Sequence, residues 1–120
     1  MVKLAKREEQ IMQAFWDLHK AFIKEIIPNL PDPKPHYNSV ATMVKILEEK
    51  GFLGHEAVGN VYQYFPVISR EEYQGHAMKD IVSQYFDNSY PRMLAFFAKQ
   101  QNLSQEEMKE ILEIIKKQKP

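Results

Sequence analysis

The amino-acid sequence predicts a mainly α-helical protein with one small β-hairpin. Two observations lead to this class. Apolar residues recur at helical spacing through most of the chain, whereas residues 52–66 carry aromatic and β-branched side chains on both sides of a Gly-Asn pair. With 120 residues, 44% of them hydrophobic, the chain is large enough for one small domain with its own core and an appended helical arm.

The first two predicted helices both present apolar side chains to a core. A helix is expected over Lys6–Leu18, and its core face comprises Ile11, Met12, Phe15 and Leu18, with Trp16 beside them. A second apolar segment contains Phe22, Ile23, Ile26, Ile27 and Leu30. Pro28 lies inside this segment and removes a backbone donor, so the second helix is expected to be short or to end near Ile27.

A third helix is predicted over residues 36–50. It follows the proline-rich connector 31–35, and Gly51 is placed to provide a left-handed C-cap. One face carries the core-facing residues Val40, Met43, Val44 and Leu47. The opposite face carries Asn38, Ala41, Thr42 and Lys45, and no acidic residue occurs from Pro33 to Leu47.

The hairpin is predicted from residues 52–58 and 61–66, which flank Gly59-Asn60. Three helices followed by a hairpin are the element order of a winged helix-turn-helix. We therefore expect a winged helix-turn-helix DNA-binding domain over residues 1–68 and a helical dimerisation region over residues 69–120.

The C-terminal region is predicted to be helical, with apolar stripes that seek a partner. Capping boxes begin at Ser69 and Ser104, Pro91 marks a helix break or start, and Tyr73, Ala77, Ile81, Tyr85 and Phe86 could form the stripe of the first of these helices. These helices could pack back on the first domain, but that domain can close its own core, so a second copy of the chain is the expected partner. The predicted dimerisation residues are Tyr85, Phe86, Met93, Leu94, Phe96, Phe97, Met108, Ile111, Leu112 and Ile115.

The polar face of the third helix suits contact with DNA bases. An ordinary solvated face is the alternative, but such faces favour Glu, Lys and Gln, whereas short amide, hydroxyl and methyl groups match base edges. The predicted base contacts are Asn38, Ser39, Ala41 and Thr42. The predicted contacts to the DNA backbone are Lys34, Tyr37, Lys45 and Lys50.

Composition limits the other classes of function. Sixteen basic and sixteen acidic residues give a formal net charge of zero, which counts against nucleic acid as a partner, so the DNA prediction rests on pattern. Cysteine is absent, the four histidines lack ligand spacing, and no catalytic motif is found. We expect no enzyme activity, no metal and no cofactor. Without an apolar run of membrane-spanning length or a signal peptide, a cytoplasmic location is expected.

Three stretches resemble the penicillinase-repressor family of bacterial winged-helix regulators, which includes methicillin-resistance and copper-responsive repressors. They are residues 4–12 (LAKREEQIM) followed by Trp16, residues 39–52 (SVATMVKILEEKGF), and Tyr62, Tyr64 and Pro66 in the wing. The resemblance covers nearly the whole chain. It implies a dimeric repressor of its own operon, often encoded beside a membrane-bound sensor protease that relieves repression by cleavage between asparagine and phenylalanine.

The chain departs from the family pattern at several positions. Ala95 precedes Phe96 where the scissile asparagine would stand, so cleavage at this point is not expected. The cysteine motif of the copper-responsive branch is missing, which argues against copper sensing. Ala5 replaces a usual capping threonine, and the wing tip Gly59-Asn60 lacks basic residues, so weak wing contacts to phosphate are expected.

The leading prediction is a homodimeric DNA-binding transcriptional repressor that binds a pseudo-palindromic operator through its third helix, controlling its own operon with a membrane sensor protease. One alternative is a winged helix used for protein contacts, which the zero net charge favours. Another is a regulator that responds to a small apolar effector bound around Tyr85, Phe86, Phe96 and Phe97.

Overall fold

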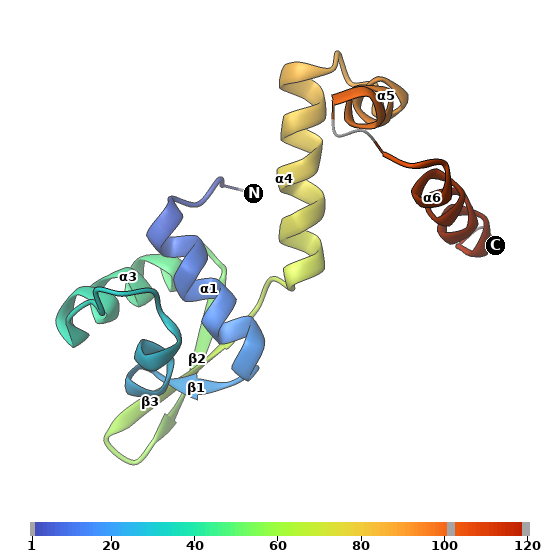
Figure 1. Ribbon diagram of the computed structural model, residues 1–120. Coiled ribbons are helices and arrows are strands. Elements are labelled where there is room, and N and C mark those ends of the chain that lie inside the picture. The colour runs from blue at the N-terminus through green and yellow to red at the C-terminus, as the bar shows by residue number, and fades with distance from the viewer. Residues whose placement is uncertain (1, 101–102, 119–120) are drawn as a thin grey trace. The chain divides into compact units, whose positions relative to one another are not determined.

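The computed structural model describes residues 2–100 and 103–118. The chain divides into two compact units, Met1–Ala77 and Met78–Pro120, with the division inside helix α4. Each unit is considered by itself. Figure 1 shows the helices and the small sheet of the chain.

The first unit contains three α-helices, a 3-10 turn, a three-stranded sheet and the beginning of a further helix. Its elements are α1 (Lys6–Leu18), β1 (Ala21–Phe22), α2 (Ile23–Ile26), the 3-10 turn η1 (Ile27–Asn29), α3 (Tyr37–Glu49), β2 (Leu53–Val58), β3 (Val61–Pro66) and the first part of α4 (Arg70–Tyr85). The sheet is antiparallel in the order β1-β3-β2. This arrangement confirms the predicted fold class, three helices followed by a hairpin wing.

The hairpin is built as its sequence predicts. Val58 pairs with Val61 across the two-residue loop Gly59-Asn60, and Gly59 has a φ of 62°. A positive φ at the first loop residue is readily adopted by glycine, and loops of this length twist in the same sense as the strands. The register of β2 and β3 is therefore fixed at the turn.

Strand β1 was not predicted. Ala21 pairs with Tyr64 and Phe22 with Gln63, so the expectation that Phe22 belongs to the second helix is wrong. A strand of two residues is too short to show an alternating pattern. The rest of the segment is as expected, because α2 ends at Ile26 and continues only as the short 3-10 turn that contains Pro28.

The core of the first unit is apolar and closed. Fully buried side chains include Ile11, Met12, Phe15, Ile26, Leu30, Val40, Val44, Leu47 and Phe52. Leu18, predicted to face this core, is 39% exposed, because it is the last residue of α1 and the chain turns at His19 with a φ of 67°. Trp16 is buried and donates its indole N–H to the carbonyl of Ile68 at 2.9 Å.

Tyr73 ties the start of α4 to this core. Its ring lies 5.8 Å from that of Trp16 and 5.9 Å from that of Phe52, centroid to centroid. Its hydroxyl donates to the Glu9 carboxylate at 2.7 Å and accepts from the backbone N–H of Leu4 at 3.3 Å. Tyr73 was predicted on a stripe of the C-terminal helices, but it is part of the first unit's core.

The second unit consists of the remainder of α4, α5 (Tyr90–Gln100) and α6 (Gln105–Lys117). Between α4 and α5 the chain turns at Asp87 and Asn88, with φ of 50° and 61°, a conformation that these residue types tolerate. Pro91 lies in the first turn of α5, as a helix-start proline should. The predicted capping boxes are confirmed at Ser69 with Glu72 and at Ser104 with Glu107.

Candidate nucleic-acid interface

Helix α3 presents one buried and one exposed face, as predicted. Val40, Val44 and Leu47 are buried, whereas Asn38, Ser39, Thr42 and Lys45 are exposed. Ala41 is only partly buried and packs against the core. The Thr42 hydroxyl donates to the Asn38 carbonyl at 3.0 Å, so its oxygen remains available as an acceptor. The exposed face of α3 therefore carries short polar side chains on one side of the helix.

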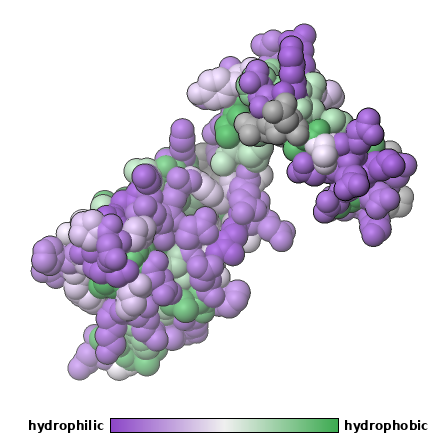
Figure 2. Space-filling view, in the orientation of Figure 1, coloured by the Kyte–Doolittle hydropathy of each residue, from purple (hydrophilic) through white to green (hydrophobic). Residues whose placement is uncertain are grey.

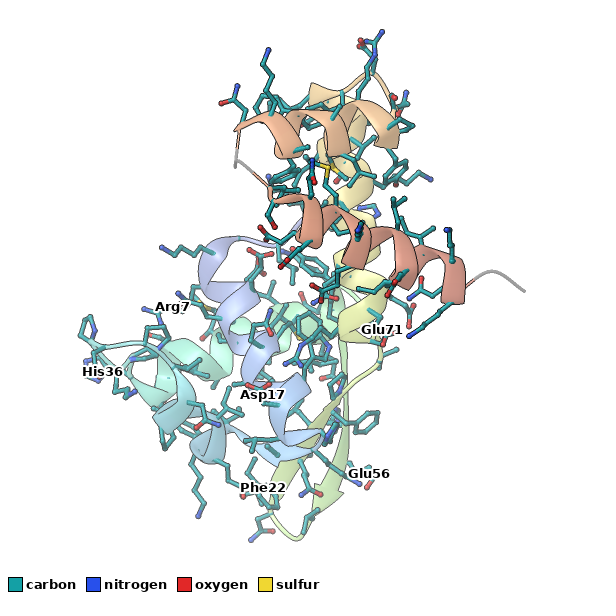
Figure 3. The ribbon with its side chains drawn as sticks, turned by 45° about the vertical axis from the view of Figure 1, so that its right-hand side comes forward. Arg7, Asp17, Phe22, His36, Glu56 and Glu71 are labelled. Atoms are coloured by element: carbon teal, nitrogen blue, oxygen red, sulfur yellow. The ribbon has the colours of Figure 1, made fainter. Side chains whose placement is uncertain are left out.

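The C-terminal end of α3 is closed by a backbone cap, whereas the N-terminal residue His36 makes no side-chain capping hydrogen bond. The helix starts after His36, which Figure 3 labels at the beginning of the helix. At the other end, the N–H of Gly51 donates to Glu48 and that of Phe52 donates to Leu47, while Gly51 adopts a φ of 85°. This is a Schellman motif, and it confirms Gly51 as the left-handed residue that ends the helix.

Two of the lysines that were predicted to contact the DNA backbone already have partners within the chain. Lys34 donates to the carbonyls of Pro28 and Leu30 and lies 3.6 Å from the Asp32 carboxylate, so it holds the connector before α3. The Lys50 ammonium lies 2.8 Å from the Glu8 carboxylate of α1. Lys50 is also twelve residues after Asn38, which places it about 18 Å further along the helix axis.

The pairing of Glu8 with Lys50 sets the charge state of a buried carboxylate. Burial acts to raise the pKa of Glu8, but the hydrogen bonds from Lys50 and from the Ala5 N–H, together with the Lys50 charge, lower it overall. Ala5 has no side-chain oxygen to cap α1, so Glu8 provides only the reverse half of a capping box.

The other two predicted backbone contacts stand free on the α3 surface. Tyr37 is 52% exposed and Lys45 is exposed, and both line a pocket together with residues of α2 and β3. Lys24 of α2 lines the same pocket. Lys24 was not among the predicted contacts, because it lies within an apolar segment that was expected to face the core.

The wing is connected to α3 through its first strand. The His55 ring stacks on Tyr62 with centroids 4.2 Å apart, and its Nδ1 lies 2.5 Å from a Glu48 carboxylate oxygen of α3. Further along β2, Glu56 forms an ion pair with Lys20 at 2.7 Å. Figure 3 labels Glu56 on the hairpin and Phe22 beside it. The hairpin therefore contacts α3 through His55 and the segment before β1 through Glu56.

The comparisons with known proteins agree with this architecture. A family model described as "Penicillinase repressor" matches residues 4–117. The chain belongs to the penicillinase repressor family. This confirms the resemblance inferred from its sequence and places it in a family of transcriptional regulators.

Two relatives illustrate how far this similarity extends. The methicillin resistance regulatory protein MecI of Staphylococcus aureus (strain N315) is 20% identical over 116 residues, which cover 96% of this chain and 94% of the relative. The penicillinase repressor of Bacillus licheniformis is 25% identical over 122 residues, covering 98% and 92%. Both alignments extend through the second unit as well as the first.

In this penicillinase repressor family member, the second unit leaves most of its apolar side chains exposed. Of the predicted dimerisation residues, Met93 is buried and Phe86 and Ile111 are partly buried, whereas Tyr85 is 72% exposed. The other exposed members are Leu94, Phe96, Phe97, Met108, Leu112 and Ile115. On α4, Val82 is buried and Ile81 is exposed, contrary to the predicted stripe. In Figure 2, hydrophobic side chains show between hydrophilic ones over α5, and the visible side of α6 is mainly hydrophilic.

Part of this surface is a groove between α5 and α6. It is lined by Leu94, Ala95, Ala98, Leu103, Met108, Ile111, Leu112 and Ile115. Five of the ten predicted dimerisation residues thus come together in one apolar groove, and Ala95, which stands at the candidate cleavage position, lies in it as well.

Within residues 2–100 and 103–118, no group of three or more His, Cys, Asp or Glu side chains could hold a metal ion. Among the same residues, no helix is long and apolar enough to cross a membrane.

Proposed function

We propose that this protein is a homodimeric repressor that binds a pseudo-palindromic operator through α3. The observation that carries the proposal is the exposed face of α3 with Asn38, Ser39 and Thr42, which has no acidic residue before Glu48 and is supported from behind by a closed core. An Asn amide can bond adenine in the major groove, and hydroxyl groups can bond several base edges. Membership of a repressor family supports the same function.

We assign base contacts to Asn38, Ser39, Ala41 and Thr42, with Ala41 contributing only its exposed part. Tyr37 and Lys45 are assigned to the DNA backbone, because both flank that face and neither forms an ion pair within the described chain. Lys34 and Lys50 were assigned the same role from sequence. Their contacts with the connector and with Glu8 make them secondary candidates.

We assign dimerisation to the second unit. Among its described residues, only Val82 and Met93 have apolar side chains that are buried, so the unit has little core of its own. Burial of the exposed aromatic and aliphatic residues against the same surface of a second copy would provide one. A two-fold dimer would present two α3 helices one or two DNA turns apart, and its symmetry predicts a pseudo-palindromic operator.

We also propose that the protein controls its own operon together with a membrane-bound sensor protease, in the cytoplasm. Ala95 lies on α5 where the resemblance would place a scissile asparagine, so release by cleavage at this bond is not part of the proposal. Sequencing of the neighbouring genes tests the operon arrangement. The absence of a protease gene beside this one would remove that element and leave operator binding untouched.

The test of DNA binding is fluorescence anisotropy with a duplex from the protein's own promoter and a scrambled duplex, each across a salt series. We expect preference for the promoter, with log affinity falling by roughly 0.9 per phosphate contact for each unit of log salt. Thr42→Glu should weaken promoter binding more than about tenfold, because it places a carboxylate against base edges and phosphates.

The matched control is Ser83→Glu, which adds the same charge at an exposed position of α4 in the second unit. Circular dichroism should show both variants folded. Equal affinities for Thr42→Glu and the unmodified protein would show that α3 does not read the operator. If neither duplex binds at low salt, the domain is a protein-interaction module, which the zero net charge also accommodates.

A further inference from the structure

The first unit contains a pocket between α2, α3 and β3, with a volume of about 370 Å³. Its walls include the aromatic rings of Phe22, Tyr37, Tyr62 and Tyr64. It lies in the winged-helix domain, not in the aromatic region of the second unit where the sequence suggested a small effector. A pocket of this size with mainly apolar walls is typical of small-molecule sites.

The charge at the rim of this pocket has one sign. Lys24 and Lys45 line it, and no lining residue is acidic. Neither ammonium group has a hydrogen bond or ion pair within the part of the chain that the structure describes, whereas Lys20, Lys34 and Lys50 all do. Two unpaired cations beside apolar walls favour an anion that carries an apolar body.

Tyr64 adds a hydroxyl group to the same wall. It is only 4% exposed, and its ring packs edge-on against Phe15 at 6.3 Å between centroids. Its hydroxyl has no hydrogen-bond partner among residues 2–100 and 103–118. Burial raises the pKa of Tyr64, with smaller contributions from Glu48, Tyr62 and Tyr37, so its hydroxyl is protonated at neutral pH and lies near those groups. Because Tyr64 lines the pocket, its hydroxyl is free to donate a hydrogen bond to a ligand oxygen there.

We propose that this pocket binds a small aromatic monoanion of the arenecarboxylate class. The aromatic body packs between the rings of the walls, and the carboxylate accepts hydrogen bonds from the free lysines and from the Tyr64 hydroxyl. A phosphate of DNA could meet the lysines but would leave Phe22 and Tyr64 unused. The combination of apolar walls with a cationic rim therefore fits an amphipathic ligand better than a bare anion.

The pocket shares three residues with the proposed DNA surface, namely Tyr37, Ala41 and Lys45. If the proposed function holds, a ligand seated here excludes DNA from the same side chains, and the site couples effector binding to release of the operator. This consequence rests on the proposed function, whereas binding of the anion does not.

The experiment uses 2-naphthoate as the probe and isothermal titration calorimetry on the full chain at low salt. Two analogues of similar shape serve as ligand controls: 2-naphthalenemethanol, which is neutral, and 2-naphthylmethylammonium, which is cationic. We expect one naphthoate site per chain, with the alcohol bound at least about tenfold more weakly and the ammonium compound not bound. Equal binding of all three compounds would overturn the proposal, because it would indicate an unspecific apolar surface.

The protein variants locate the site. The double variant Lys24→Gln, Lys45→Gln should weaken naphthoate at least about tenfold, and Tyr64→Phe about fivefold through loss of one hydrogen bond. The matched control Lys116→Gln, Lys117→Gln removes the same charge from the end of α6 and should leave binding within about twofold. Thermal unfolding verifies that each variant is folded. Unchanged affinity in the Lys24, Lys45 variant would overturn the site.

A final titration separates this proposal from the proposed function. Promoter affinity is measured by anisotropy with and without saturating naphthoate, and we expect it to fall when the ligand is present. Naphthoate that binds through Lys24 and Lys45 but leaves promoter affinity unchanged would overturn the shared surface. A protein that binds naphthoate but no duplex would overturn the repressor function and leave the ligand site standing.

Discussion

The Lys50 ammonium lies 2.8 Å from the Glu8 carboxylate and thereby joins the end of α3 to the first turn of α1. The Glu8 side chain is 11% exposed and that of Lys50 29%, so the pair is largely shielded from water. In a shielded ion pair, removal of one partner destabilises the fold because it leaves the other charge buried and unpaired. The pair therefore fixes α3 against the core at the end remote from Asn38.

Removal of the Lys50 charge should destabilise the fold. Lys50→Met leaves the Glu8 carboxylate without its partner. We expect the free energy of unfolding to fall by about 2–3 kcal/mol, which is less than for a fully buried pair because this pair retains some exposure. Urea denaturation measures it. Lys45→Met is the matched control, because Lys45 has no ion pair, and it should leave stability within about 0.5 kcal/mol. Equal stability of the two variants would show that the Glu8 pair is not structural.

The same pair predicts a loss of stability in acid. Folding lowers the pKa of Glu8 below its ordinary value of 4.5. The stabilising contribution is therefore complete above that value and is lost as the pH falls through the lower pKa of the folded state. Urea midpoints of the unmodified protein and of Glu8→Gln should converge as the pH is lowered from about 7 to about 3. A difference that stays constant over this range would contradict the assignment.

Tyr73 predicts a change at the alkaline end. Burial and the hydrogen bond to Glu9 raise the pKa of Tyr73 to about 12. Its contribution to stability is complete below the ordinary value of 10 and is lost as the pH rises through about 12. Spectroscopic titration of tyrosinate should show a step near pH 12 that is missing in Tyr73→Phe. That variant should also lose about 1–2 kcal/mol at neutral pH, through the hydrogen bonds to Glu9 and Leu4.

The sequence predicted correctly those elements that have a clear local sequence pattern. The apolar stripe from Ile11 to Phe15 identified a helix, and the pair Gly59-Asn60 between two β-branched runs identified a turn. Both elements are found where they were expected. Gly51 was identifiable as the end of α3 because a helix commonly ends at a left-handed residue, and glycine adopts that conformation readily. Such signals are local, so they need no knowledge of the tertiary fold.

The features that the sequence did not reveal depend on contacts between distant residues. The two-residue strand β1 exists because Ala21 meets Tyr64, and no periodicity records that pairing. Lys50 pairs with Glu8 across 42 positions, and Lys24 and Lys45 line the same pocket only because α2 and α3 border it. Tyr73 was assigned to the wrong unit for the same reason. The chemistry of the candidate surface was readable, but the partners of its lysines were not.

Leu112 tests the proposed dimer. It is 56% exposed in α6 and lines the groove with Ile115, so Leu112→Gln should weaken self-association while leaving each chain folded. Burial of a leucine side chain contributes about 2–3 kcal/mol, and a two-fold interface contains it twice, so sedimentation should show the dimer dissociation constant raised by more than about tenfold. Ile114, 50% exposed but outside the groove, provides the matched control Ile114→Gln. Equal weakening by both variants would show that the groove is not the centre of the interface, and a protein that sediments as a monomer before substitution would exclude the dimer itself.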